Sequence, residues 1–196
     1  GLISRLDRYI WEQAAAKLGE WKKAGINMSI SVNISPKDFY YIDIFNTFAG
    51  LIKKYDIEPS NLKIEITETT IMSDVPNLMG ELEELRKAGF TLEMDDFGSG
   101  YSSLNTLKDI NVDVLKVDMG FIKETKNVKK SRIILASVIK MAKELNLLII
   151  TEGVETEEQV DNLTKLGCDV FQGYYFSKAI DINEFEKRYL YRKKAG

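Results

Sequence analysis

The feature that most restricts the fold of this chain is a regular alternation of helical and extended patterns. Apolar residues recur at helical spacing from Ser4 to Ala24, and they then alternate with serine and asparagine from Met28 to Ser35. The same succession predicts further strands at 62–68, 91–96, 112–118, 147–151 and 170–176, and helices at 37–55, 75–88, 129–145, 157–166 and 182–193, with a short helix after residue 100. Because ten or more residues separate neighbouring strands, we expect crossover connections and one parallel sheet of six strands.

Polar residues mark the ends of these predicted strands. Strands buried between helices should be apolar, yet five of the six carry an ionisable or amide residue at or near the C-terminal end, and the sixth carries Gln172 near its start. The five sets are Asn33, Glu65, Asp95 with Asp96, Lys116 with Asp118, and Glu152. A doubly wound sheet concentrates function in one or two loops, whereas a (β/α)8 barrel draws it from many strand ends. The distribution therefore favours a barrel.

The alternation within the strands supports the same architecture. Asn33 shares one face of its strand with Ser29, Ser31 and Ser35, whereas the opposite face is Ile and Val. We predict that such polar faces line the barrel interior and that the apolar faces lie beneath the helices. A (β/α)8 barrel has eight strands in about 250 residues. This chain has 196 residues, so we predict an incomplete TIM-like barrel with about six of the eight βα units, its two missing strands lying before Gly1.

The composition limits the chemistry. The chain has no histidine, which excludes Ser-His-Asp catalysis, histidine bases and histidine-ligated metals. A single cysteine excludes an intrachain disulfide and a thiolate cluster. The net charge of -3 argues against a broad nucleic-acid-binding face, so we expect no DNA partner. No apolar stretch approaches the roughly 18 residues of a membrane span. A metal site would use oxygen ligands, which favours Mg²⁺, Mn²⁺ or Ca²⁺.

The residues at the strand ends suit phosphodiester chemistry. Glu65, Asp95 and Asp96 supply carboxylates, and adjacent aspartates can bridge two divalent ions, a common arrangement for phosphodiester cleavage. Lys116 would add positive charge near the attacked phosphate or the attacking water. Glu152 is a candidate base or water-orienting group.

Several of these residues also have a structural interpretation, which the sequence leaves open. Asn33 could be a polar side chain among serines. Glu93 and Lys116 could form a buried ion pair inside the barrel. The segment 96–100 could be only a turn. We interpret Cys168 as a small buried residue rather than a nucleophile.

Six motifs in order along the chain resemble the EAL domain of bacterial cyclic-di-GMP phosphodiesterases. They are S-V-N-I-S-P at 31–36, E-I-T-E at 65–68, D-D-F-G-S-G-Y-S-S-L at 95–104, L-K-V-D at 115–118, T-E-G-V-E at 151–155 and Q-G-Y at 172–174. The resemblance implies a (β/α)8-type barrel and metal-dependent hydrolysis of cyclic di-GMP to linear pGpG, with Mg²⁺ or Mn²⁺ in a two-metal site. It implies that the metal ligands are Asn33, Glu65, Asp95 and, for the second ion, Asp96.

The resemblance also assigns roles to the other strand-end residues. It implies that Lys116 contacts the nucleophilic water and that Glu152 helps to hold that water or the second ion. Gln172 would line the same mouth and bind substrate. Glu68 lies on the opposite face of its strand from Glu65. We expect Glu68 to brace the loop from residue 97 to residue 101 through backbone N–H groups.

The chain departs from the family in one respect: the Glu-Ala-Leu segment that names it is absent. In the family this segment precedes the helix that begins near Gly1 here, and its glutamate is a metal ligand. The resemblance therefore implies an N-terminally truncated EAL-type domain over residues 1–196. We expect an active parent enzyme, a fragment that is inactive alone, and homodimers.

The wider context is also an expectation from the resemblance. We expect a sensor or GGDEF domain upstream and a cytoplasmic location, with any membrane anchor supplied by other domains. Two alternatives remain at this point. One is a catalytically silent cyclic-di-GMP receptor, and the other is a different Mg²⁺-dependent barrel enzyme, such as one that forms an enolate.

Overall fold

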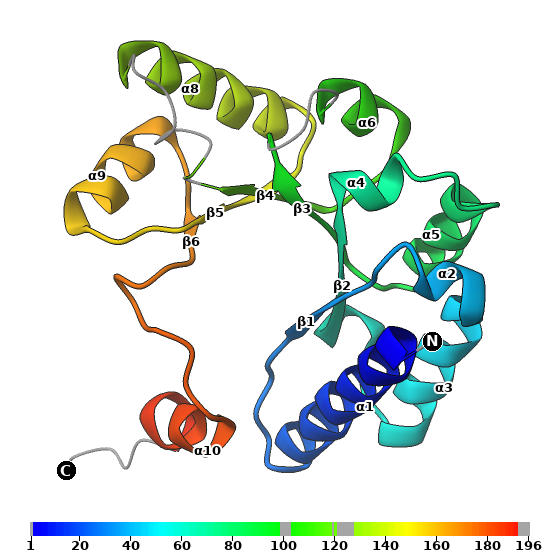
Figure 1. Ribbon diagram of the computed structural model, residues 1–196. Helices are drawn as coiled ribbons and strands as arrows, with labels where there is room; N and C mark the ends of the chain where they lie inside the picture. Colours follow the sequence, from blue (N-terminus) through cyan, green and yellow to red (C-terminus); the bar gives the residue numbers. More distant parts are fainter. Residues whose placement is uncertain (1, 99–102, 119, 121–127, 192–196) are drawn as a thin grey trace.

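The computed structural model describes residues 2–98, 103–118, 120 and 128–191 (Figure 1). The first half of the chain forms α1 (Leu2–Lys23), β1 (Ile30–Asn33), α2 (Asp38–Tyr41), α3 (Ile44–Tyr55), the 3-10 turn η1 (Pro59–Asn61), β2 (Leu62–Thr67), α4 (Glu68–Ile71), α5 (Leu78–Lys87) and β3 (Leu92–Phe97). The second half forms α6 (Ser103–Asp109), β4 (Val114–Asp118), α8 (Val128–Glu144), β5 (Leu148–Glu152), α9 (Glu157–Leu166), β6 (Val170–Phe171), α10 (Ile182–Phe185) and the π-helical turn η2 (Glu186–Leu190).

The six strands form one parallel sheet in chain order, from β1 to β6. The sheet curls, and the helices lie on its outer side, so that the described part of the chain forms a half-barrel (Figure 1). Each strand connects to the next through a helical crossover, as right-handed βαβ units require. The predictions of a parallel sheet of six strands and of an incomplete TIM-like barrel are confirmed.

The two faces of the sheet differ as the alternation predicted. On the outer face, Ile64, Met94 and Leu115 are fully buried beneath the helices. Aromatic side chains fill this layer: Phe48 on α3 packs against Trp11 on α1 at a ring-centroid distance of 5.0 Å and edge-on against Phe90 at 5.8 Å. The inner face carries the hydrophilic residues of the same strands, so the hydrophobic core lies between sheet and helices.

Helix ends are set by local capping. The predicted helix at 37–55 is interrupted, because Asp43 accepts a hydrogen bond from the backbone N–H of Asn46 and thereby starts α3 separately from α2. At α9, Thr156 and Gln159 form a capping box, and Gly167 ends the helix in the left-handed conformation with a φ of 95°. These helix starts and ends fix where each crossover connection returns to the sheet.

The last predicted strand, 170–176, is wrong in extent, because only Val170–Phe171 pairs with β5. After Phe171 the chain crosses the loop that follows β5. The Gln172 N–H donates to the Thr151 carbonyl at 2.8 Å, and the Val154 N–H donates to the Gln172 carbonyl at 3.1 Å. Gly173 permits this crossing, since a Cβ there would lie 2.1 Å from the Val154 carbonyl oxygen. The predicted strand at 28–35 is also shorter, Ile30–Asn33.

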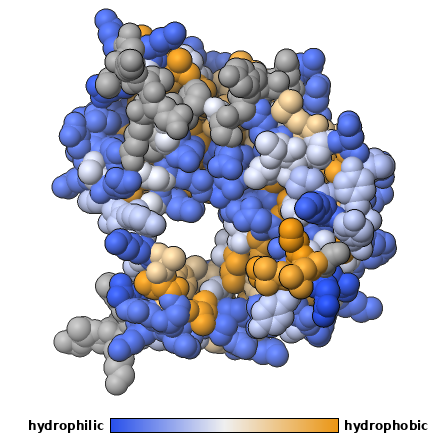
Figure 2. Space-filling model, viewed as in Figure 1, coloured by the Kyte–Doolittle hydropathy of each residue, from blue (hydrophilic) through white to orange (hydrophobic). Residues whose placement is uncertain are grey.

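The seam of the half-barrel lies between β1 and β6, the two ends of the sheet. In the helix layer, side chains from the two ends of the chain bridge this seam. The ring of Trp21 on α1 packs on that of Phe185 on α10 at a centroid distance of 6.0 Å, and the Trp21 indole N–H donates a hydrogen bond to Glu186 Oε1 at 2.8 Å. In the sheet layer β1 and β6 are not paired with one another over the described residues. An apolar groove of about 710 Å³ runs along the seam, lined by residues that include Met28, Ile30 and Phe176. Figure 2 shows the open centre of the molecule beside this seam.

Over the described residues, no helix is both long and apolar enough to cross a membrane.

The tight approach at Gly173 generates a stability prediction. Gly173→Ala should lower the free energy of unfolding by about 1–3 kcal/mol, because the new methyl group would force the Gln172 turn away from Val154. The matched control is Gly50→Ala in α3, where a Cβ meets nothing within 4 Å. That change should raise stability by roughly 0.5–1 kcal/mol. Urea unfolding of both variants followed by circular dichroism measures the two effects, and equal shifts would contradict the packing at Gly173.

The open sheet edges predict self-association of residues 1–196. Unpaired backbone groups on β1 and β6 favour pairing with another chain. Light scattering should give a mass above 22.4 kDa that increases with concentration. Ile30→Lys places a charge at the seam and should shift the mass towards the monomer, whereas Ile133→Lys on the exposed side of α8 should not. A monomer at all concentrations would contradict the prediction.

Candidate active site at the carboxyl ends of the strands

Lys116 on β4 is the centre of the candidate site. Its ammonium lies 2.8 Å from Glu65 Oε1 on β2, 2.9 Å from Glu152 Oε1 on β5 and 3.3 Å from Asp95 Oδ1 on β3. The lysine side chain is 5% exposed and the three carboxylates are 12–16% exposed. Four neighbouring strands therefore contribute to one cluster at the end of the barrel where catalytic residues of this architecture lie.

The charges in this cluster do not balance. Burial alone would lower the pKa of Lys116, but the hydrogen bonds that its ammonium donates to Glu65 and Glu152 outweigh this effect and raise that pKa above its usual value. Burial raises the pKa of Glu65 and of Glu152, and Lys116 offsets this only in part because Asp95 adds a like charge. One ammonium thus faces more than one buried carboxylate, and the site carries surplus negative charge.

Asp96 is directed to the same end of the barrel by a break in the ladder. The pairing between β3 and β4 shifts register between Met94 and Phe97, and Asp96 has a positive φ of 56°. Its N–H donates to Asp95 Oδ1 at 3.0 Å. Burial raises the pKa of Asp96, and the negative charges of Asp95 and Asp118 raise it further. A bulge of this kind redirects a side chain that would otherwise point to the opposite face.

Asn33 and Gln172 lie at the two ends of the same arc. Asn33 is the last residue of β1 and pairs in register with Glu65, and its carbonyl accepts a hydrogen bond from the Trp11 indole N–H at 2.9 Å. Gln172 directly follows β6, with its backbone held against the end of β5. The register places Asn33 beside the central cluster. The contacts that hold Gln172 are the backbone hydrogen bonds to Thr151 and Val154 described above.

Glu68 begins α4 directly after β2 and is buried at 1% exposure. The loop that it is expected to brace includes residues 99–101, which lie outside the described residues.

A second polar layer lies inside the barrel below the cluster, and it decides the alternative that the sequence left open for Glu93 and Lys116. Glu93 does not pair with Lys116. Its carboxylate lies 3.0 Å from Lys63 Nζ on β2 and accepts a hydrogen bond from Ser31 Oγ at 3.0 Å. Lys63 was missed as a partner, although its position two residues before Glu65 puts both on the inner face.

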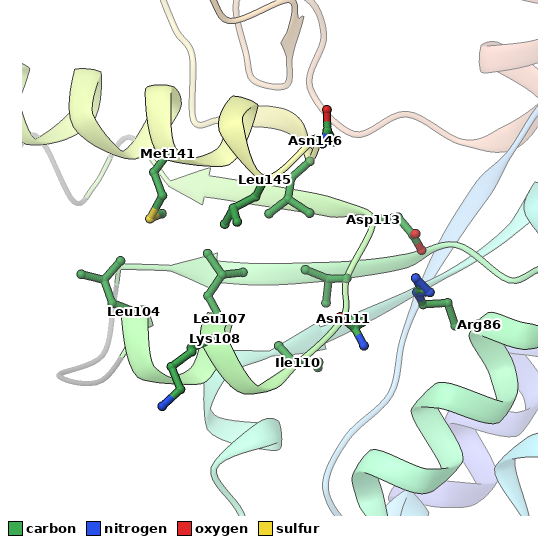
Figure 3. Close-up of a pocket in the computed structure, with 12 residues that line it drawn as sticks. Arg86, Leu104, Leu107, Lys108, Ile110, Asn111, Asp113, Met141, Leu145 and Asn146 are labelled. Carbon is green, nitrogen blue, oxygen red and sulfur yellow. The ribbon is translucent and has the colours of Figure 1, made fainter.

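The groove in Figure 3 lies away from this cluster, although it is well formed. It has a volume of about 630 Å³ and lies between α6 and α8, with apolar walls that include Leu107 and Met141. At one end Arg86 points towards Asp113, which precedes β4 (Figure 3). The groove therefore lies towards the amino ends of the strands, opposite the candidate site.

The donor set of the cluster suits hard divalent cations. Carboxylate oxygens from Glu65, Asp95, Asp96 and Glu152 supply the surplus negative charge that Mg²⁺ or Mn²⁺ would neutralise. The carboxylates surround the Lys116 ammonium. Within the described ranges, no three acidic or cysteine side chains are arranged to hold an ion between them. The donor atoms are therefore of the type that a divalent cation prefers, whereas their arrangement here encloses the ammonium.

Comparison with known proteins identifies the family. Residues 1–179 match the family described as the EAL domain. The chain is 34% identical over 187 residues to the signaling protein YkoW of Bacillus subtilis, covering 95% of this chain and 23% of that protein. It is 35% identical over 179 residues to the bifunctional diguanylate cyclase/cyclic di-GMP phosphodiesterase MucR of Pseudomonas aeruginosa, covering 91% of this chain and 26% of MucR. The chain thus spans about a quarter of the length of these relatives.

Solved structures agree with this assignment. The MucR phosphodiesterase in complex with c-di-GMP superimposes with a TM-score of 0.86 at 33% identity, covering 94% of this chain and 75% of that chain. BlrP1 of Klebsiella pneumoniae, in a complex with manganese and cyclic di-GMP, gives a TM-score of 0.78 at 29% identity over 89% of this chain and 44% of that chain. The half-barrel, its ring of strand-end polar residues and the match over residues 1–179 place this chain in the EAL domain family.

Proposed function

We propose that the intact protein containing this chain hydrolyses cyclic di-GMP to linear pGpG, in a reaction that depends on Mg²⁺ or Mn²⁺. The observation that carries the proposal is the Lys116 cluster, in which a buried ammonium contacts carboxylates from three other strands. The names of the relatives support the substrate, since MucR is described as a cyclic di-GMP phosphodiesterase and was solved with c-di-GMP.

The proposed metal ligands are Asn33, Glu65, Asp95 and Asp96. Their oxygens are of the type that Mg²⁺ and Mn²⁺ prefer, and the surplus negative charge of the cluster favours a dication. When bound, divalent ions would supply Lewis-acid activation of water and of the phosphate. The manganese complex of BlrP1 supports this choice of metal.

Lys116 and Glu152 carry the proposed proton and charge chemistry. The Lys116 ammonium would hold the attacking water and stabilise negative charge that develops on the phosphate. Glu152, at 2.9 Å from that ammonium, would accept a proton from the water. The water oxygen then bonds to phosphorus, the bond from phosphorus to the 3′ oxygen breaks, and the 3′ oxygen takes up a proton. This opens the ring and leaves a 5′ phosphate, as in pGpG.

The remaining roles complete the proposal. Gln172 at the end of the arc would contact substrate, and Glu68 would brace the loop after Asp96. We further propose that the EAL-type domain over 1–196 is N-terminally truncated and inactive alone, that the parent acts as a homodimer in the cytoplasm, and that a sensor or GGDEF domain lies upstream. The multidomain length of the relatives supports the last point.

One alternative is a receptor that binds cyclic di-GMP without cleaving it. The observation that favours it is that, over the residues described, the acidic side chains enclose an ammonium rather than an ion site. A phosphodiesterase converts cyclic di-GMP to product, whereas a receptor binds it and releases it unchanged. The direct test incubates the parent protein with cyclic di-GMP and Mg²⁺ or Mn²⁺ and separates pGpG by chromatography. Binding without product would favour the receptor.

The proposed metal ligand Asp95 offers a direct test by substitution. In the parent enzyme, Asp95→Asn should lower kcat by about 10³-fold or more, equivalent to about 4 kcal/mol, because a proposed metal ligand is lost. The matched control is Asp161→Asn on the exposed side of α9, which should keep normal turnover. Chelation of divalent ions should abolish the activity of the unmodified enzyme, and added Mn²⁺ should restore it. An Asp95→Asn enzyme with near-normal hydrolysis would contradict the assignment.

Substitution of Lys116 tests the proposed role of its charge. Lys116→Met should lower kcat strongly, on the order of 10²-fold, because the charge beside the attacked phosphate is lost. The Mn²⁺ concentration that gives half-maximal rate should rise little, since the carboxylates remain. Lys140→Met, on an exposed side chain of α8, serves as the control. A Lys116→Met enzyme with near-normal kcat would show that Lys116 has no part in the chemistry.

A further inference from the structure

The inner ion pair of Lys63 and Glu93, with Ser31, forms a charged layer directly below the active-site cluster. Lys63 Nζ lies 3.0 Å from Glu93 Oε1, and Ser31 Oγ donates to Glu93 Oε2 at 3.0 Å. Glu93 is 1% exposed, so bulk water cannot compensate its charge. A buried carboxylate of this kind requires a cation and hydrogen-bond donors, and here Lys63 and Ser31 supply them.

Glu93 is also close to the groups that Lys116 binds. It is the register partner of Glu65 on β2 and of Val114 on β4, two residues before Lys116 on the same face. Glu65, its register partner, is in turn one of the carboxylates that the Lys116 ammonium contacts, at 2.8 Å. The buried Lys116, the partly buried Lys63 and several carboxylates thus share one interior, and the pairing between them decides where each ammonium points.

We propose that Lys63 is a positioning residue, which neutralises Glu93 and thereby keeps the Lys116 ammonium directed at Glu65, Asp95 and Glu152. Its effect on turnover rests on the function proposed above. Ser31 assists by holding the second oxygen of Glu93.

The physical reason is that carboxylates in two layers of the barrel interior compete for the Lys116 ammonium. Without Lys63, Glu93 would be a buried and uncompensated carboxylate on the strand next to β4. Attraction in this low-dielectric interior would draw the Lys116 ammonium one layer down, towards β3. The contact that suffers most is the one to Glu152, because that residue lies on β5, on the opposite side of β4 from Glu93. Lys116 would then be withdrawn from the mouth of the site.

Three variants of the parent enzyme test this proposal, because it predicts a different change in kcat for each of them. Lys63→Met should lower kcat by about tenfold, with the KM for cyclic di-GMP within about twofold of the unmodified value, because Lys63 is engaged with Glu93 one layer below the proposed site. Lys63→Arg should retain most of the activity, since the charge is kept. The double variant Lys63→Met with Glu93→Gln should recover kcat to within about threefold, because no competing carboxylate remains. Lys87→Met, an exposed lysine on α5, is the control.

Two outcomes of the kinetics would overturn the proposal. One is a Lys63→Met enzyme that keeps more than about half of the kcat. The other is a double variant as slow as Lys63→Met alone, which would mean that Lys63 acts through packing rather than through the charge of Glu93.

A readout without turnover separates this proposal from the function itself. In a crystal structure of residues 1–196 carrying Lys63→Met, the Lys116 ammonium should lie within hydrogen-bond distance of Glu93 and no longer of Glu152. An unchanged Lys116 position would overturn the proposal even if the parent enzyme is active, and a shifted one would support it even if the parent hydrolyses nothing. If Lys63→Met does not fold, Ser31→Ala replaces it, since it removes one hydrogen bond to Glu93 and leaves Lys63 in place. Ser31→Ala should then move Lys116 in the same direction by less, and no movement would overturn the proposal.

Discussion

The structure of this EAL domain depends on the burial of charge inside a curled parallel sheet. Lys116 lies on the inner face of β4 at 5% exposure and can remain an ammonium there only because Glu65, Asp95 and Glu152 approach it from three other strands. Removing one partner of a buried ion pair costs about 3–5 kcal/mol. The register of β2, β3, β4 and β5 is therefore tied to the same contacts that form the candidate site. The surplus of carboxylates over ammonium is the reason for proposing divalent cations at this site.

Much of this arrangement is predictable from local patterns. The strand order follows from alternating helical and extended segments with long crossovers, and the position of Asn33, Glu65, Asp95, Lys116 and Glu152 near strand ends brings them to one edge of a parallel sheet. Parity within each strand separates the polar interior from Ile64, Met94 and Leu115 beneath the helices. These features depend on residues close in sequence, which is why the sequence determines them so directly.

The features that the sequence did not reveal depend on contacts between distant segments. Glu93 pairs with Lys63 rather than Lys116. The β2–β3 register sets Glu93 opposite Glu65 and so places Lys63, two residues earlier on the same face, on the diagonal, and parity alone cannot choose between two inward-facing lysines. The direction of Asp96 follows from a register shift and a positive φ that no pattern of residue types specifies. The last strand stops at Phe171 because Gly173 approaches the Val154 backbone, a contact made across two loops.

The central claim is that the carboxylates around Lys116 hold the divalent ions of a cyclic-di-GMP phosphodiesterase. The most direct measurement is the anomalous diffraction of Mn²⁺ in crystals of the parent protein grown with cyclic di-GMP. Our account predicts anomalous peaks in contact with Glu65 and Asp95, with a phosphate of the ligand beside Lys116. Manganese bound elsewhere, with Lys116 still enclosed by Glu65, Asp95 and Glu152 and the ligand distant from it, would contradict the account.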